Sequence, residues 1–143
     1  MISIRGEKVA LDTNVWIFAL RKGPDFAACE TLVFDKLHEL QIHMPLQIFL
    51  ELQRNLAPSE IRRLVHGLTL TQAVTWDYTP AQPELVRHWE QRGVQKGDAV
   101  IAAHLEEAAV RYLISENRDF LTAIPALPFS ILSRSYLINL REF

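Results

Sequence analysis

Acidic and amide side chains that could do chemistry occur at four places along the chain: Asp12, Glu51, Asp98, and the pair Asn117 and Asp119. If the fold brought these carboxylates together, they would repel one another and their charged forms would be disfavoured. A hard divalent cation removes this conflict, because Mg²⁺ and Mn²⁺ prefer carboxylate and water oxygens as ligands. Two such ions held by carboxylates are a standard device for phosphodiester hydrolysis. The pattern therefore indicates metal-assisted phosphodiester chemistry. The single cysteine and five scattered histidines show no ligand spacing typical of zinc.

Each of the four places also has an ordinary structural explanation. Asp12 and Asp98 are residue types that cap helix N-termini. Glu51 is spaced to pair with Arg54, three residues further along a helix. The last two residues, Asn117 and Asp119, are types favoured in turns. Taken singly, each residue can be explained without a catalytic role, so their joint arrangement carries the functional hypothesis.

Strands and helices are expected to alternate along the sequence and to position these side chains. Strands are expected at 9–11, 42–44, 74–76, 111–115 and 129–132. Helices are expected from residue 15 and over 25–40, 45–56, 58–66, 80–91 and 98–109, with Gly67 ending the fourth. Strands separated by helices imply crossover connections, and so an α/β fold with a mostly parallel sheet. Ligands bind such sheets beyond the carboxyl ends of the strands, where Asp12 and the residues after Ser115 lie.

Two helix starts bear directly on the acids. Thr13 or Asn14 could cap the helix that begins at Val15, which would release Asp12 for another task. Asp98 shares a helix face with apolar residues three, four and seven positions on (Ile101, Ala102 and Leu105). The Asp98 carboxylate should therefore point toward the protein interior.

Composition and length fit one globular domain covering residues 1–143. Hydrophobic residues make up 49% of the chain and charged residues 22%, and no apolar run approaches the roughly 18 residues of a membrane span. Cys29 has no second cysteine with which to form an internal disulfide, which favours a cytoplasmic location. The net charge of −2 argues against binding nucleic acid by bulk positive charge, although bound metal would supply positive charge locally.

In order and spacing, the four places resemble the PIN domain, and more closely the single-domain endoribonuclease toxins of the VapC type. The matching stretches run from residue 9 to about 120: Leu11-Asp12-Thr13-Asn14-Val15, Glu51, Asp98-Ala99-Val100-Ile101-Ala102-Ala103, and Ser115-Glu116-Asn117-Arg118-Asp119-Phe120. The joint order of these stretches carries the resemblance, since no one of them is decisive.

The resemblance implies a three-layer fold, with about five mostly parallel strands between helices on both faces. It implies Mg²⁺ or Mn²⁺ held by Asp12, Glu51 and Asp98, with Thr13, Asn14 and Ser115 in support. Asn117 stands where the family usually has an acidic or amide residue, so Asn117 or Asp119 would complete the site. The implied activity is cleavage of RNA by the toxin of a type II toxin–antitoxin pair, with an antitoxin partner and a homodimer. No membrane association is expected, because no apolar run is long enough for a span.

Two alternatives belong to other functional classes. Asn117 in the fourth place and the acidic net charge fit a PIN-like module that binds RNA or protein without cleaving. An aspartate after the first strand also occurs in phosphatases and phosphotransferases that resemble the haloacid dehalogenase group. Those enzymes usually have a second Asp two residues later, where this chain has Asn14, and the chain is short for that fold.

Overall fold

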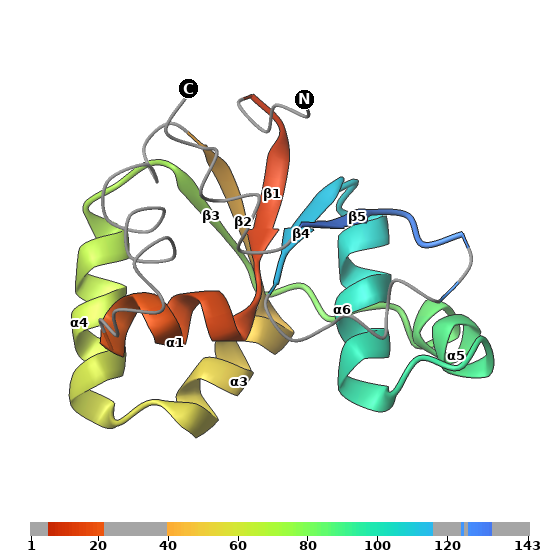
Figure 1. Ribbon diagram of the computed structural model, residues 1–143, viewed down its shortest axis with the longest axis horizontal. Helices are drawn as coiled ribbons and strands as arrows, with labels where there is room; N and C mark the ends of the chain where they lie inside the picture. The colour runs from red at the N-terminus through yellow and green to blue at the C-terminus, as the bar shows by residue number, and fades with distance from the viewer. Residues whose placement is uncertain (1–5, 22–39, 116–123, 125, 133–143) are drawn as a thin grey trace.

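A parallel sheet of five strands, in the order β3-β2-β1-β4-β5, runs through the centre of the structure (Figure 1). The structure is a computed structural model that describes residues 6–21, 40–115, 124 and 126–132. The strands are β1 (Lys8–Leu11), β2 (Gln41–Pro45), β3 (Val74–Asp77), β4 (Tyr112–Ile114) and β5 (Ser130–Leu132). Each strand pairs in parallel with its neighbour, as the alternation of strands and helices in the sequence predicts.

The central strand β1 is buried on both faces. Val9, Ala10 and Leu11 are at most 1% exposed. A continuous apolar run without alternation is typical of a parallel strand covered by helices on both sides. The sheet is therefore an inner layer.

Helices cover both sides of this layer. They are α1 (Thr13–Arg21), α3 (Leu46–Asn55), α4 (Pro58–Thr69), α5 (Pro83–Gln91) and α6 (Lys96–Glu107). Figure 1 shows α1, α3 and α4 gathered at one side of the sheet and α5 and α6 at the other. This is the three-layer α/β arrangement that the sequence predicts. The helix expected over 25–40 lies almost wholly outside the described residues.

Several predicted helix boundaries are wrong by two or three residues: α1 begins at Thr13 rather than Val15, and α5 begins at Pro83 rather than Pro80. Gly67 does not end its helix, because α4 continues to Thr69 and buries Leu68 one turn beyond Leu64. Burying a leucine is worth more than the roughly 1 kcal/mol that a helical glycine costs. Helix α6 begins at Lys96 rather than at Asp98.

The strand order changes direction at β1. From β1 the chain moves to β2 and β3 on one side, and then crosses to β4 and β5 on the other. Open parallel sheets bind ligands at such a point, outside the carboxyl ends of the strands. Here it lies between the ends of β1 and β4, where Asp12 and Ser115 follow. Among the helices that the structure describes, none combines the length and the hydrophobicity of a membrane span.

Candidate active site

Asp12 lies at the carboxyl end of β1 and is completely buried. Its Oδ1 accepts a hydrogen bond from the Thr13 amide at 2.8 Å, and its Oδ2 accepts one from Ser115 Oγ at 2.7 Å. The Asp12 amide in turn donates to the Ile114 carbonyl at 2.9 Å. The ends of β1 and β4 are thus joined through one buried carboxylate, whose orientation these bonds fix.

Asp12 also occupies the capping position of α1, which corrects the expectation that Thr13 or Asn14 would take it. Helix α1 begins at Thr13, and the Asp12 carbonyl accepts from the amides of Val15 at 3.0 Å and Trp16 at 3.4 Å. The sequence offered three adjacent capping residues, and the earliest one lies at the helix start. Asp12 therefore serves as a cap while its carboxylate remains part of the site, and the two roles do not compete.

The Thr13 hydroxyl extends the network to α3. Thr13 Oγ1 donates to Glu51 Oε2 at 2.7 Å, and Glu51 is half-buried. Hydrogen bonds therefore run continuously from Ser115 through Asp12 and Thr13 to Glu51. Asn14, the other predicted supporting residue, lies half-buried in the first turn of α1.

Asp98 is buried at the third position of α6, with 6% of its surface exposed. The capping position belongs to Gln95, whose side chain makes no capping hydrogen bond. The adjacent Gly97 faces α3: a Cβ placed there would lie 3.9 Å from Glu51 Oε1. The first turn of α6 thus lies next to Glu51. As predicted from the helix face, Ile101, Ala102 and Leu105 are all buried.

The structure thus brings most of the predicted site residues to one place. Hydrogen bonds join four of them, Asp12, Thr13, Glu51 and Ser115, and Asp98 lies in the helical turn beside these residues. Asn117 and Asp119 fall outside the described residues, so their contribution remains a prediction.

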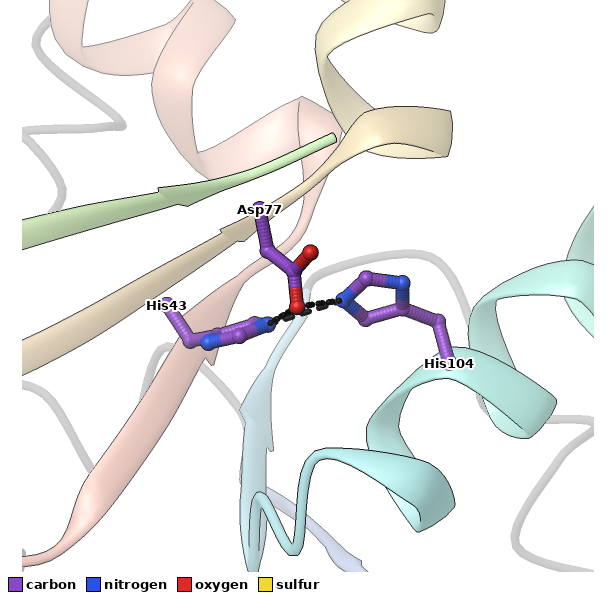
Figure 2. A group of neighbouring side chains, drawn as sticks. All are labelled: His43, Asp77 and His104. Atoms are coloured by element: carbon purple, nitrogen blue, oxygen red, sulfur yellow. Dashed lines mark hydrogen bonds and ion pairs between the residues drawn. The ribbon is translucent and has the colours of Figure 1, made fainter. Parts of the chain in front are cut away.

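A second polar cluster, formed by His43, Asp77 and His104, was not predicted from the sequence. Figure 2 shows the Asp77 carboxylate pointing between the two imidazole rings, which come from β2 and α6. The two Nε2 atoms lie 2.8 Å apart, and each is 3.4 Å from Asp77 Oδ2. His43 and His104 are 7% and 5% exposed. In the chain, His43 and Asp77 are 34 positions apart, and Asp77 and His104 are 27 positions apart. No local spacing pattern could therefore reveal the cluster.

The charge states in this cluster follow from burial. Desolvation lowers the pKa of both His43 and His104, so both rings are neutral at pH 7. The Thr79 amide donates to Asp77 Oδ1 at 2.9 Å, and this bond chiefly lowers the pKa of Asp77. One neutral ring donates its Nε2 hydrogen to the other ring. The cluster therefore carries one negative charge.

One signal in the sequence could have pointed to these histidines. His43 lies in the otherwise apolar strand segment Ile42-His43-Met44, and His104 lies in an alanine-rich helix. A polar side chain in a segment expected to be buried needs a partner, because burying it without one is costly. Two such side chains in different elements are candidates to be each other's partners.

A family model for the PIN domain matches residues 9–124 of the chain. The match covers most of the chain, including all four places with acidic or amide residues and strands β1 to β4 apart from Lys8. The chain therefore belongs to the PIN domain family, a family of nucleases.

Solved structures show the same fold. VapBC2 from Rickettsia felis, bound to a DNA fragment from its promoter, matches with a TM-score of 0.59 and 19% identity, over 88% of this chain and 98% of that chain. VapC20 from Mycobacterium tuberculosis, a toxin that cleaves the sarcin-ricin loop, matches with a TM-score of 0.57 and 14% identity, over 80% and 94% of the two chains. No curated protein sequence matches the chain.

Proposed function

We propose that this PIN domain is a Mg²⁺- or Mn²⁺-dependent endoribonuclease in which Asp12, Glu51 and Asp98 hold the metal. The observation that carries the proposal is the hydrogen-bonded chain from Ser115 through Asp12 and Thr13 to Glu51, next to the first turn of α6. It lies where the sheet changes direction, which is the usual ligand position in this class of fold.

The donor set fits a hard cation. Three carboxylates and two hydroxyls provide oxygen only, which Mg²⁺ and Mn²⁺ prefer over nitrogen or sulfur. Burial of Asp12 and Asp98 beside a third acid is costly without a compensating positive charge. When bound, the metal would supply that charge, polarise the scissile phosphate and favour ionisation of an attacking water.

The chain's own residues would orient these groups. Ser115 and the Thr13 amide donate to different oxygens of Asp12 and so fix the plane of its carboxylate. The Thr13 hydroxyl fixes Glu51 in the same way. Supporting hydrogen bonds of this kind are worth about 10–100-fold in metal affinity or activity. Asn117 or Asp119 would complete the site from the segment after β4.

We further propose that the substrate is a cellular RNA and that the protein is the toxin of a type II toxin–antitoxin pair. The VapBC2 complex and VapC20, the toxin that cleaves the sarcin-ricin loop, share the fold and support this assignment. A cognate antitoxin, assembly as a homodimer and a cytoplasmic location belong to the same proposal.

The test is cleavage of RNA by the purified protein, freed from any partner. We expect cleavage with Mg²⁺ or Mn²⁺, loss of activity in chelator and recovery when the metal is restored. Asp98→Asn should lose at least about a hundredfold in rate. Glu84→Gln is the matched control, because Glu84 also lies in the first turn of a helix but is exposed. Cleavage by Asp98→Asn at the wild-type rate would refute the mechanism.

A PIN-like binding module is the second candidate, favoured by Asn117 in the fourth place and by the net charge of −2. Such a module would bind RNA or protein without hydrolysis. Calorimetry with Mn²⁺ separates the two candidates. Absence of binding at millimolar Mn²⁺ would favour the module, whereas binding that Asp12→Asn abolishes would favour the nuclease.

A further inference from the structure

The cluster of His43, Asp77 and His104 is separate from the carboxylate site and plays no part in the proposed nuclease mechanism. It joins three elements: β2, the end of β3 and α6. In the parallel pairing of β2 and β3, His43 is opposite Thr75, so Asp77 lies two residues on and on the same face of the sheet. His104 lies six residues beyond Asp98 on α6, about 9 Å along the helix axis.

From this arrangement we propose that His43, Asp77 and His104 form a second metal site, which binds Zn²⁺ or a similar transition-metal ion. The three ligand atoms are two imidazole nitrogens and one carboxylate oxygen, all within 4.8 Å of one another. Imidazole and carboxylate are established zinc ligands, whereas Mg²⁺ prefers oxygen throughout. The donor chemistry therefore distinguishes this site from the carboxylate site.

The separations between the ligand atoms are close to those of a tetrahedral site. Zn–N distances of about 2.0–2.1 Å in a tetrahedron place neighbouring ligand atoms about 3.3 Å apart. Both distances from Asp77 Oδ2 to Nε2 are 3.4 Å and already fit. The distance of 2.8 Å between the two Nε2 atoms is that of a hydrogen bond. Metal binding would replace this bond and move the rings apart by about half an ångström.

The charge states and hydrogen bonds of the cluster favour binding of a cation. Neutral imidazoles offer the lone pair that a metal needs, and the Asp77 charge offsets part of the charge of the ion. The Thr79 amide, which donates to the other oxygen of Asp77, holds the carboxylate in place.

We expect a fourth ligand to enter from solvent, because the Asp77 side chain is 27% exposed. An open cavity of about 180 Å³ has His104 in its wall, together with Thr79 and Pro80. A cavity of this size holds several waters. We therefore expect a site with three protein ligands and one water, reached through this cavity. The bound ion would fasten α6 to β2 and β3.

The experiment is a titration of the full chain with Zn²⁺, followed by calorimetry, after treatment with chelator and in saturating Mg²⁺. The Mg²⁺ would occupy the proposed carboxylate site but compete poorly for imidazole. We expect one Zn²⁺ per chain with micromolar or tighter Kd, and a rise of about 5–10 °C in Tm when Zn²⁺ is in hundredfold excess over Kd. The imidazole ¹⁵N resonances of His43 and His104 should shift as Zn²⁺ binds, while those of the exposed His66 should not.

Substitutions test whether Asp77 and His104 are ligands of the bound Zn²⁺. His104→Gln should abolish binding, and Asp77→Asn, which preserves shape, should weaken it at least about tenfold. His66→Gln should bind as the wild type does. No Zn²⁺ binding below about 100 μM by the wild type, or unchanged binding by His104→Gln, would overturn the proposal. Neither outcome depends on RNA cleavage, so this site and the proposed nuclease can fail independently.

Discussion

Ser115 gives a direct measure of how the Asp12 carboxylate is held. Its hydroxyl donates to Asp12 Oδ2 at 2.7 Å, where Asp12 is completely buried. Ser115→Ala removes one donor to a buried charge. Hydrogen bonds to charged groups contribute about 1.5–3 kcal/mol, so we expect a loss of that size in the free energy of unfolding, together with about 10–100-fold weaker Mn²⁺ binding. Urea unfolding and calorimetry check both effects. The exposed Ser59 provides the control, and equal behaviour of Ser59→Ala and Ser115→Ala would contradict the assignment.

In the metal-free protein, the free energy of unfolding should depend on pH through His43 and His104. Burial lowers the pKa of both rings, and the Asp77 charge opposes this shift in each ring. The Lys8 charge lowers the pKa of His43 further, whereas the Glu107 charge raises the pKa of His104. The unfolded chain therefore binds more protons below the ordinary histidine pKa of about 6.5. The free energy of unfolding should fall as pH drops from 7.5 to 5.5, each ring adding at most about 1.4 kcal/mol per pH unit.

Urea unfolding in chelator across this pH range measures the slope. His104→Gln removes one of the two groups and should make the slope of the free energy of unfolding against pH shallower. His66→Gln changes an exposed ring and should leave most of that slope unchanged. A slope that is the same in the wild type and in His104→Gln would show that burial of His104 does not control stability in this range.

At the scale of elements, the approach of α6 to α3 positions two of the acids. Gly97 lies in the first turn of α6, where an added Cβ would be 3.8 Å from Gln47 Nε2 and 3.9 Å from Glu51 Oε1. These are ordinary contact distances, so Gly97→Ala should fit and raise the free energy of unfolding by about 0.5–1 kcal/mol. Gly97→Leu should instead displace Glu51 and weaken Mn²⁺ binding.

Gly67 is the matched control for this prediction. It lies within α4, and nothing is within 4 Å of an added Cβ. Gly67→Ala and Gly67→Leu should both stabilise the helix without changing Mn²⁺ binding, as measured by thermal unfolding and calorimetry. If Gly97→Leu binds Mn²⁺ as well as Gly67→Leu does, then α6 does not position Glu51 as described.

The elements also show which parts of the structure a sequence can predict. The central strand and the buried face of α6 follow from apolar runs and three- and four-residue spacing, and both predictions are confirmed. Helix ends were less predictable, because several neighbouring residues can cap a helix or end it, and tertiary packing decides among them. Asp12, Thr13 and Asn14 were equivalent caps in the sequence, and the burial of Leu68 carried α4 past Gly67. The cluster of His43, Asp77 and His104 depends on tertiary packing alone.

At the scale of the whole molecule, the proposed function requires an acidic protein to bind RNA, a polyanion. The net charge is −2, and the proposed active site adds several carboxylates in one place. Long-range attraction of RNA by the protein itself is therefore weak, and binding would depend on local contacts and on the bound cation. The sheet supports such a site because β1 and β4 end side by side where the strand order changes direction.

The most direct test of the proposed metal-dependent nuclease is the single-turnover rate of RNA cleavage by Asp12→Asn in Mn²⁺. Asparagine keeps the shape of the side chain and an oxygen to accept from the Thr13 amide, so the fold should be preserved while the charge is lost. We expect a rate at least about a hundredfold below that of the wild type, with weaker Mn²⁺ binding and an unchanged circular dichroism spectrum. Cleavage at the wild-type rate by a folded Asp12→Asn protein would contradict the proposed mechanism.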